Sequence, residues 1–240
     1  MAITFNGTTI NSVKFNNNAI DKVTFNGTTV FQSQPQTLLI GTSHSSNSNG
    51  IVLCNRYGGS NTSALYTGTN ASTETSYTFD GFTISIEKTA HTYEYSLLRV
   101  FDGESGGGYA ESGTGKDSTL TTYIVFPFAV ELTNITVYNL GYIASLSGKK
   151  DFSTYSVGSS TSSSATSFNS VGSGISAGST LTASNNKTGI RKLQIITSGY
   201  STASYGKRTL GEIKMTVNVS YSDYQTWKTT YGLTGNTNIP

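Results

Sequence analysis

The sequence is short of charge, of cysteine and of long apolar runs. Charged residues make up 12% of its 240 residues, against about 25% in an average globular protein. The single cysteine, Cys54, rules out an intrachain disulfide, so stability has to come from packing or assembly. The formal net charge is only +2, and the sequence has no cluster of Lys and Arg that could follow a phosphate backbone. Both observations argue against a nucleic-acid partner. We therefore expect a surface built from Ser, Thr, Asn and Gly.

Segments that address a chain to a membrane are also missing. No apolar run approaches the length of a membrane span. The first residues do not combine a basic segment with an apolar one. We therefore expect no membrane partner, and synthesis in a cytoplasm.

Catalytic and metal-binding motifs are scarce. His44 and His91 are the only histidines, and neither stands at ligand spacing from Cys54 or from the other, so we expect no metal site and no cofactor. No Gly-x-Ser-x-Gly elbow both follows an expected strand and opens a helix. The carboxylate pairs that a polysaccharide-degrading enzyme would need are limited to Glu87 with Glu94 and Asp102 with Glu104. Such acids are also typical of a solvated surface, so we expect a protein that is not an enzyme.

What is present is typical of an all-β protein. Thr, Tyr, Val and Ile are abundant, and Ile84-Ser85-Ile86 alternates with the period of a strand that has one buried face. Strands are expected at Thr37–Gly41, Gly50–Cys54, Tyr77–Ile86, Tyr93–Phe101, Thr119–Phe128, Ala129–Leu140, Ile190–Thr197 and Leu210–Tyr221. Pro127 should split two strands or mark a sheet edge, because it has no N–H to donate. The pattern predicts an antiparallel β-sandwich, of jelly-roll type, over residues 37–240.

Two stretches rich in Gly and Ser separate these strands. Asp102–Asp117 and Ser145–Thr188 have few side chains to bury and are expected to form long loops. Long loops on a rigid β scaffold are a usual place for binding.

One short helix is expected near the C-terminus. Ser222 or Asp223 should cap it, and it should end at Gly232. Its aromatic side chains, Tyr224, Trp227 and Tyr231, share one face. We expect this face to close an open end of the sandwich, and the alternative is an aromatic platform for a sugar ring.

The first thirty-two residues contain one decapeptide three times, as ITFNGTTINS, VKFNNNAIDK and VTFNGTTVFQ. Chain reversals are expected at Asn6-Gly7, Asn17-Asn18 and Asn26-Gly27, where Asn and Gly supply the positive φ of a type I′ turn. The strands of this meander are too short to bury a core within one chain. The repeats should therefore attach to a partner or pair across subunits, and the alternative is docking on the chain's own sheet. The apolar residues assigned to attachment or oligomerisation are Phe5, Phe15, Phe25, Ile10, Ile20 and Val30.

These repeats resemble short modules at the ends of bacteriophage virion proteins, particularly tail-fibre, head-fibre and other appendage proteins. The resemblance covers residues 3–31. It implies attachment to a particle or a symmetric stalk, other virion proteins as partners, and display on the exterior of the virion after synthesis in the host cytoplasm. The expected organisation is a hairpin repeat module at 1–32, a linker at 33–36 and a sandwich at 37–240.

Binding of a host surface polysaccharide is the activity that we expect of the sandwich, displayed as a homotrimer. Sugars are recognised by planar hydrogen-bonding side chains and by aromatic faces, and the chain is rich in Asn and Tyr. The candidate carbohydrate-binding residues adjoin the Gly- and Ser-rich segments and are Tyr142, Tyr155, Tyr200 and Tyr205. The alternative for each tyrosine is strand packing. The alternative for the protein is a purely structural capsid decoration or connecting protein without a ligand.

Overall fold

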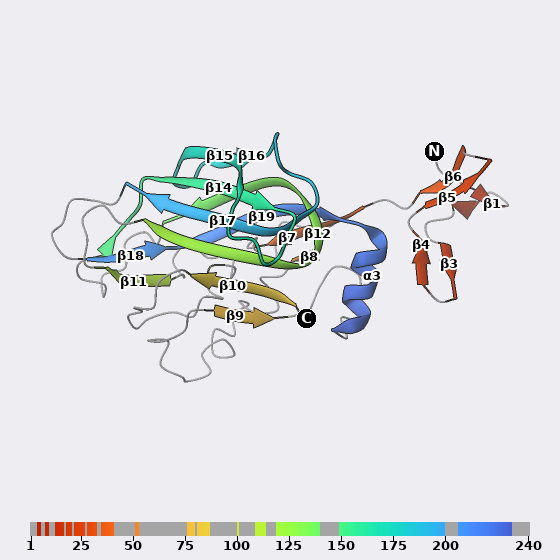
Figure 1. The fold of residues 1–240 in the computed structure, drawn as a ribbon, viewed down its shortest axis with the longest axis horizontal. Coiled ribbons are helices and arrows are strands. Elements are labelled where there is room, and N and C mark those ends of the chain that lie inside the picture. Colours follow the sequence, from red (N-terminus) through yellow and green to blue (C-terminus); the bar gives the residue numbers. More distant parts are fainter. Residues whose placement is uncertain are drawn as a thin grey trace.

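The structure is a computed structural model of the full chain. It describes residues 4–5, 8–9, 13–16, 18–20, 22–26, 28–32, 35–40, 51–52, 76–79, 81–86, 100, 109–113, 119–139, 149–199 and 206–231. These residues form a predominantly antiparallel β fold with one helix, α3 (Figure 1). The predicted all-β class is confirmed. No helix in this part of the chain is long and apolar enough to cross a membrane.

Six short strands at the N-terminus form three separate hairpins. They are Thr4–Phe5 (β1) with Thr8–Thr9 (β2), Val13–Phe15 (β3) with Asn18–Ile20 (β4), and Lys22–Phe25 (β5) with Thr28–Gln32 (β6). Each hairpin is its own two-stranded sheet, so the described strands pair within a repeat and do not continue as the expected meander.

The turns of the hairpins use asparagine in the left-handed conformation. Asn16 has a φ of 50° and Asn26 a φ of 46°, as a type I′ turn requires. Phe15 pairs with Asn18, so Asn18 already belongs to β4. The expected reversal at Asn17-Asn18 is wrong by one residue, because a two-residue loop here follows the Phe directly, as it does after Phe25.

One layer of the sandwich contains the chain's serine-rich strands. Its antiparallel order is Asn169–Ser176 (β15), Thr154–Ser160 (β14), Ile190–Ser198 (β17), the first half of Leu120–Tyr138 (β12), Phe82–Ile86 (β10) and Ser76–Phe79 (β9). The second layer contains Thr180–Thr182 (β16), the second half of β12, Glu212–Val219 (β19), Gln36–Ile40 (β7) and Ile51–Val52 (β8). A separate three-stranded sheet contains Tyr109–Gly113 (β11), Gly206–Leu210 (β18) and Lys149–Lys150 (β13).

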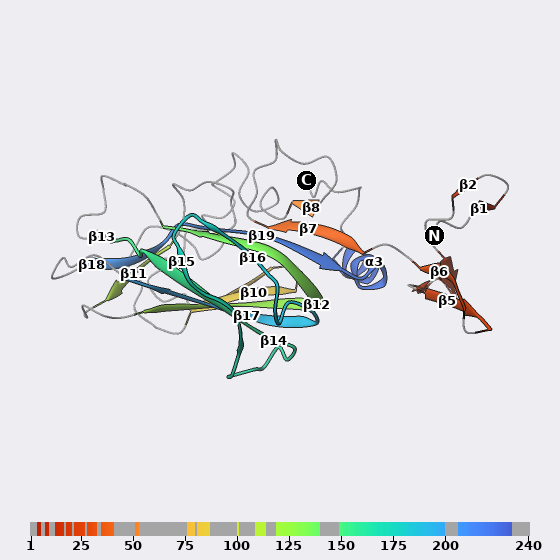
Figure 2. The same ribbon diagram turned by 90° about the horizontal axis from the view of Figure 1, so that it is seen from above.

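Strand β12 belongs to both layers and curves from one to the other (Figure 2). Its pairing with β17 shifts from Val125 to Val130 while β17 moves only from Lys192 to Ile190. Pro127 lies inside this irregularity, where its missing N–H interrupts no ladder. Nε of Arg191 donates to the carbonyl of Phe126 at 3.3 Å, which satisfies a main-chain acceptor there. The expected break at Pro127 is therefore wrong: the proline lies where one strand changes layer.

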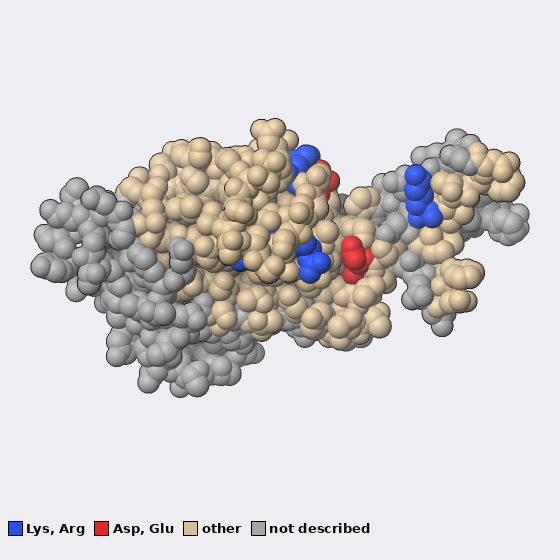
Figure 3. Space-filling view, in the orientation of Figure 1, with Lys and Arg blue, Asp and Glu red and all other residues tan. Residues whose placement is uncertain are grey.

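Charged side chains are sparse among the described residues on the face shown in Figure 3, as the composition predicts. The ion pair between Lys187 and Glu131 has a distance of 2.7 Å. The hydrogen bond from Lys187 lowers the pKa of Glu131 in spite of partial burial. Because the main-chain N–H of Leu132 also donates to the carbonyl of Lys187 at 2.8 Å, the segment before β17 is held against β12.

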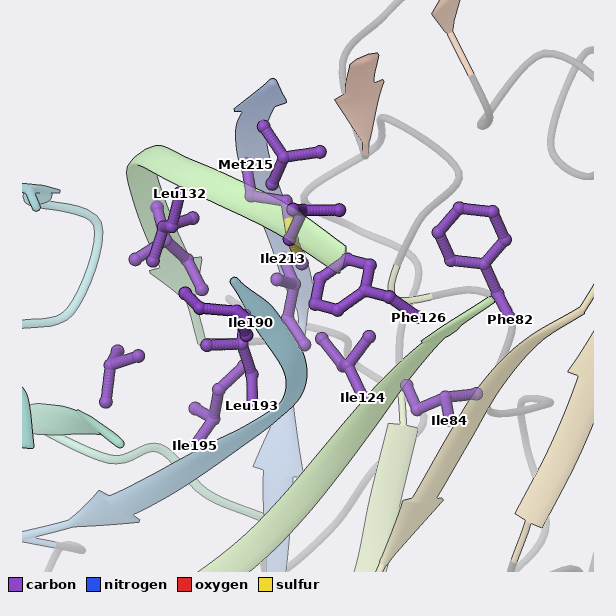
Figure 4. Packing of buried hydrophobic residues seen from close by; sticks show 14 of the residues in the cluster. Phe82, Ile84, Ile124, Phe126, Leu132, Ile190, Leu193, Ile195, Ile213 and Met215 are labelled. Carbon is purple, nitrogen blue, oxygen red and sulfur yellow. The ribbon is translucent and has the colours of Figure 1, made fainter. Parts of the chain in front are cut away.

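The two layers enclose one hydrophobic core (Figure 4). Side chains alternate inward along β10 at Phe82 and Ile84, and along β19 at Ile213 and Met215. This alternation places both sets between the layers.

The expected long loop at Ser145–Thr188 is wrong, because this stretch contains β13 to β16. The small residues of this stretch do not prevent strand formation. They allow neighbouring side chains to pack closely against the strands. A Cβ on Gly172 in β15 would lie 2.7 Å from Cδ1 of Leu181, so glycine is what lets the leucine cover this strand. In the other expected loop, Asp102–Asp117, residues 109–113 form β11, and its remaining residues lie outside the described part.

Helix α3 (Tyr221–Thr230) ends two residues before Gly232, and the expected caps are wrong, because Ser222 and Asp223 lie in its first turn. The cap is Ser220, whose Oγ accepts from the main-chain N–H of Asp223 at 3.1 Å. The Trp227 ring is buried, with centroids 5.7 Å from Phe82 and 5.8 Å from Phe128. The helix therefore closes one end of the core, and a sugar platform at Trp227 is excluded.

Candidate functional site

Of the four tyrosines predicted to contact sugar, Tyr155 is the only one in the described residues. It is 0% exposed. Its hydroxyl lies 3.0 Å from the carbonyl of Ile135 and 2.6 Å from that of Ser179, so it joins β14 to the opposite layer. Burial raises the pKa of Tyr155 to about 12. The prediction for Tyr155 is wrong, because a ring inside the core cannot stack on a glycan. Tyr142, Tyr200 and Tyr205 lie outside the described residues.

The hairpins expose the aromatic residues of their repeats. Phe15 is 67% and Phe25 is 69% exposed, and Ile20 is partly exposed. Phe5 lies in β1 and Val30 in β6, whereas Ile10 lies outside the described residues. Strand β4 lies close to α3. This proximity fits the alternative in which a hairpin docks on the chain's own domain, but it leaves the two phenylalanines uncovered.

An aromatic pair that the sequence did not single out lies on the outer face of the first layer. Tyr123 in β12 and Phe168, in the connection from β14 to β15, stack with centroids 5.7 Å apart and an interplanar angle of 27°. Both rings are partly exposed. Lys192 and Gln194 of β17 point to the same side, because Leu193 between them is buried in the core. We call Tyr123, Gly158, Phe168, Lys192 and Gln194 the aromatic face.

Gly158 in β14 makes room for the upper ring of this pair. A Cβ there would lie 2.8 Å from Cβ of Phe168, closer than two carbon atoms pack without one moving. Gly158 and Tyr123 both pair with Gln194 across β17. The absent side chain therefore lets Phe168 cross β14 and reach Tyr123.

Lys192 holds the connection that carries Phe168. Its Nζ lies 4.7 Å from the centroid of Tyr123 and 5.6 Å from that of Phe168, which are distances of a cation–π contact. The same ammonium donates to the carbonyl of Ala165 at 2.8 Å. The lysine therefore places a positive charge beside the aromatic pair.

The aromatic face continues across five strands as two rows set by the register. One row contains Ser76, Ser85, Tyr123, Gln194 and Gly158, and the next contains Thr78, Thr83, Val125, Lys192 and Ser160. Five strands spaced by about 4.8 Å span about 19 Å. The surface therefore combines stacked rings with hydroxyl and amide groups over a length greater than one sugar ring.

A similar lysine–aromatic contact lies on the second layer. Nζ of Lys214 in β19 lies 5.1 Å from the centroid of Tyr138 in β12. No second aromatic ring is described beside Tyr138. The Lys214–Tyr138 contact is therefore a suitable control for the aromatic face.

The described residues contain no group of three or more His, Cys, Asp and Glu side chains that could hold a metal ion. The carboxylate pairs considered from the sequence, Glu87 with Glu94 and Asp102 with Glu104, lie outside those residues, as does Cys54. One further acid, Glu212, is buried at the start of β19, which the alternation of that strand did not predict.

The aromatic face could not be found by composition alone. Tyr123 stands in a strand that alternates cleanly, so its outward direction was readable from the buried neighbours expected on either side. Phe168 is the one large apolar residue in SSTSSSATSF. A single large apolar side chain in such a polar segment indicates that it packs against another part of the chain. That it meets Tyr123 depends on strand order.

No protein-family model and no curated protein matches the chain. Among solved structures, chitosan-binding module 1 from a chitosanase/glucanase of Paenibacillus sp. IK-5 is similar with a TM-score of 0.41 and 14% identity, over 61% of this chain and 98% of that module. The family 32 carbohydrate-binding module of Clostridium perfringens NanJ, in complex with galactose, has a TM-score of 0.40 and 11% identity, over 57% and 93% of the two chains. TM-scores this low carry no argument about function, so the residues of this chain have to supply it.

Proposed function

We propose that this chain is a non-enzymatic structural component of a phage particle, attached through its hairpins, whose β-sandwich binds a glycan at the aromatic face. The observation that carries the glycan part is the partly exposed stack of Tyr123 on Phe168. A sugar ring packs its C–H groups on an aromatic face, and its hydroxyls bond to polar side chains around it, which is the usual make-up of a small-molecule site. Gln194 and the hydroxyl rows provide such side chains.

The attachment part rests on the exposed phenylalanines at equivalent positions of the repeats. Two large apolar side chains, at 67% and 69% exposure, on hairpins of very short strands favour a partner that covers them. Immunogold electron microscopy of the particles tests the virion location. A purely structural decoration protein would share this attachment, and it is the interpretation that remains if the aromatic face binds no glycan.

Loss of the repeat phenylalanines is expected to disassemble the protein. In the full-length chain, replacing Phe5, Phe15 and Phe25 together by serine should convert the expected homotrimer into a monomer, because the hairpins then lose the largest apolar side chains that they could share. Light scattering measures the mass in solution. Thr24→Ala, an exposed neighbour of Phe25 in β5, is the control and should stay trimeric. An unchanged mass for the triple variant would refute assembly through the hairpins.

Loss of either ring of the aromatic pair is expected to weaken glycan binding. A stacking contact of about 0.5–1.5 kcal/mol corresponds to about two- to twelvefold in Kd, so Tyr123→Ala and Phe168→Ala should each raise Kd by that factor on an array of bacterial surface polysaccharides. Gly158→Ala should do the same by pushing Phe168 off Tyr123, without deleting a ring.

The matched control is Tyr138→Ala, which removes the tyrosine under Lys214 on the other layer. It should bind as the unaltered chain does. Normal binding by all three aromatic-face variants would contradict a site there, provided that circular dichroism shows them folded.

A further inference from the structure

Apart from Glu131 in the second half of β12, the strands that form the aromatic face carry no carboxylate. Between Asp151 and Glu212 the sequence contains no Asp or Glu but five Lys or Arg. The β9 and β10 strands and the first half of β12 contain no acid either. Of these basic residues, Lys187 is neutralised by Glu131 at 2.7 Å, whereas Lys192 lies on the aromatic face itself. The described strands of this face therefore carry a net positive charge.

Lys192 retains donors for a ligand. An ammonium group has three N–H donors, and the carbonyl of Ala165 accepts one at 2.8 Å. The group is only partly buried, beside the ring on which a sugar would stack. A substituent of that sugar could then bind the ammonium group while Lys192 keeps its hydrogen bond to Ala165.

We propose that the glycan bound here carries a carboxylate, as uronic-acid polysaccharides do, and that Lys192 binds that group; this rests on the proposed glycan site. One ammonium suits a monoanion. A phosphate has more acceptor oxygens and favours several cationic donors, whereas Lys192 is the one cation among the residues that define the aromatic face. Tyr123 and Phe168 hold the ring, and Lys192 distinguishes a charged ring from a neutral one.

The test uses the full-length protein and pairs of polymers that differ in charge alone. Polygalacturonate, alginate and hyaluronate are each immobilised beside their carboxyl-reduced, neutral forms, and a phosphomannan is included as the phosphate probe. The chain is expected to bind at least one acidic polymer about tenfold more tightly than its reduced form, the size of one charge-assisted hydrogen bond. This preference should shrink as salt is raised.

Lys192→Gln should bring the ratio of the two affinities, acidic over reduced polymer, close to one, and Lys192→Arg should keep most of that ratio. Lys214→Gln, which removes an equal charge over an aromatic ring on the other layer, is the control and should keep the full preference.

Equal binding of the acidic and reduced forms would overturn the inference. So would a Lys192→Gln variant that loses both forms equally, because the lysine would then only hold the loop of Ala165. In either case an effect of Phe168→Ala would leave the glycan proposal standing. Preference for phosphomannan would replace the carboxylate by phosphate. If no polymer binds, the proposed function and this inference fail together.

Discussion

Replacing Tyr155 by alanine is expected to lower the free energy of unfolding by about 3–5 kcal/mol. The ring is fully buried, and its hydroxyl reaches main-chain carbonyls of the opposite layer at 3.0 and 2.6 Å. The variant creates a cavity and leaves those carbonyls without this donor. Urea denaturation followed by circular dichroism measures the change.

Tyr155→Phe separates the hydroxyl from the ring and should cost about 1–3 kcal/mol. Because burial raises the pKa of Tyr155 from 10.0 to about 12, its contribution to stability is full below pH 10 and is lost as the pH rises toward 12. The phenylalanine variant should therefore lose less stability across that alkaline range. Tyr123→Ala, an outward position, is the control and should change stability far less. A stable Tyr155→Ala protein that fails only in glycan binding would show that Tyr155 acts at the ligand after all.

Replacing Trp227 by alanine is expected to cost a similar 3–5 kcal/mol, about the range for a buried aromatic residue. The indole packs edge-to-face on Phe82 and Phe128 and lies 6.3 Å from Tyr224 in its own helix. Its loss opens the end of the core that α3 covers, so the melting temperature should fall and α3 should become accessible to protease.

Thr226→Ala is the control for Trp227→Ala. Thr226 is the exposed neighbour in the same helix, and a surface change of this kind should stay within about 0.5 kcal/mol. If both variants melt together with the unaltered chain, α3 is an appendage and does not complete the core.

Sequence patterns predicted elements wherever a local rule determines the outcome. Alternation in Ile84-Ser85-Ile86 identified β10, because one buried face forces a period of two. Asparagine-rich reversals identified the hairpins, because Asn tolerates positive φ, and the error of one residue at Asn17-Asn18 arose where three asparagines in a row left the turn undetermined. The helix was found from its aromatic spacing, although Ser220 proved to be the cap.

Composition misled where small residues have a packing role. The Ser- and Gly-rich stretch of 145–188 was expected to be loop because it offers little area to bury, but Leu181 covers Gly172 and Phe168 covers Gly158. In such strands the neighbour's side chain fills the space, and hydrogen bonds to β14 and β17 complete the sheet. Pro127 does not break the strand for a related reason, since the bend of β12 removes the need for its N–H.

The sequence by itself determined the all-β class, the repeat of the hairpins and the direction of most strand side chains, because these follow from residue type and short-range period. Only the tertiary structure decided which residues meet. Tyr123, Phe168 and Lys192 come from three segments far apart in the chain, and they form one face because β17 lies between β12 and β14. The same strand order places the inward-pointing Tyr155 beneath the second layer, where its hydroxyl meets the carbonyls of Ile135 and Ser179. Strand order depends on burial between segments far apart in the chain, and no local sequence pattern contains that information. The residues of the candidate site could be read from the sequence, but their contact with one another could be seen only in the fold.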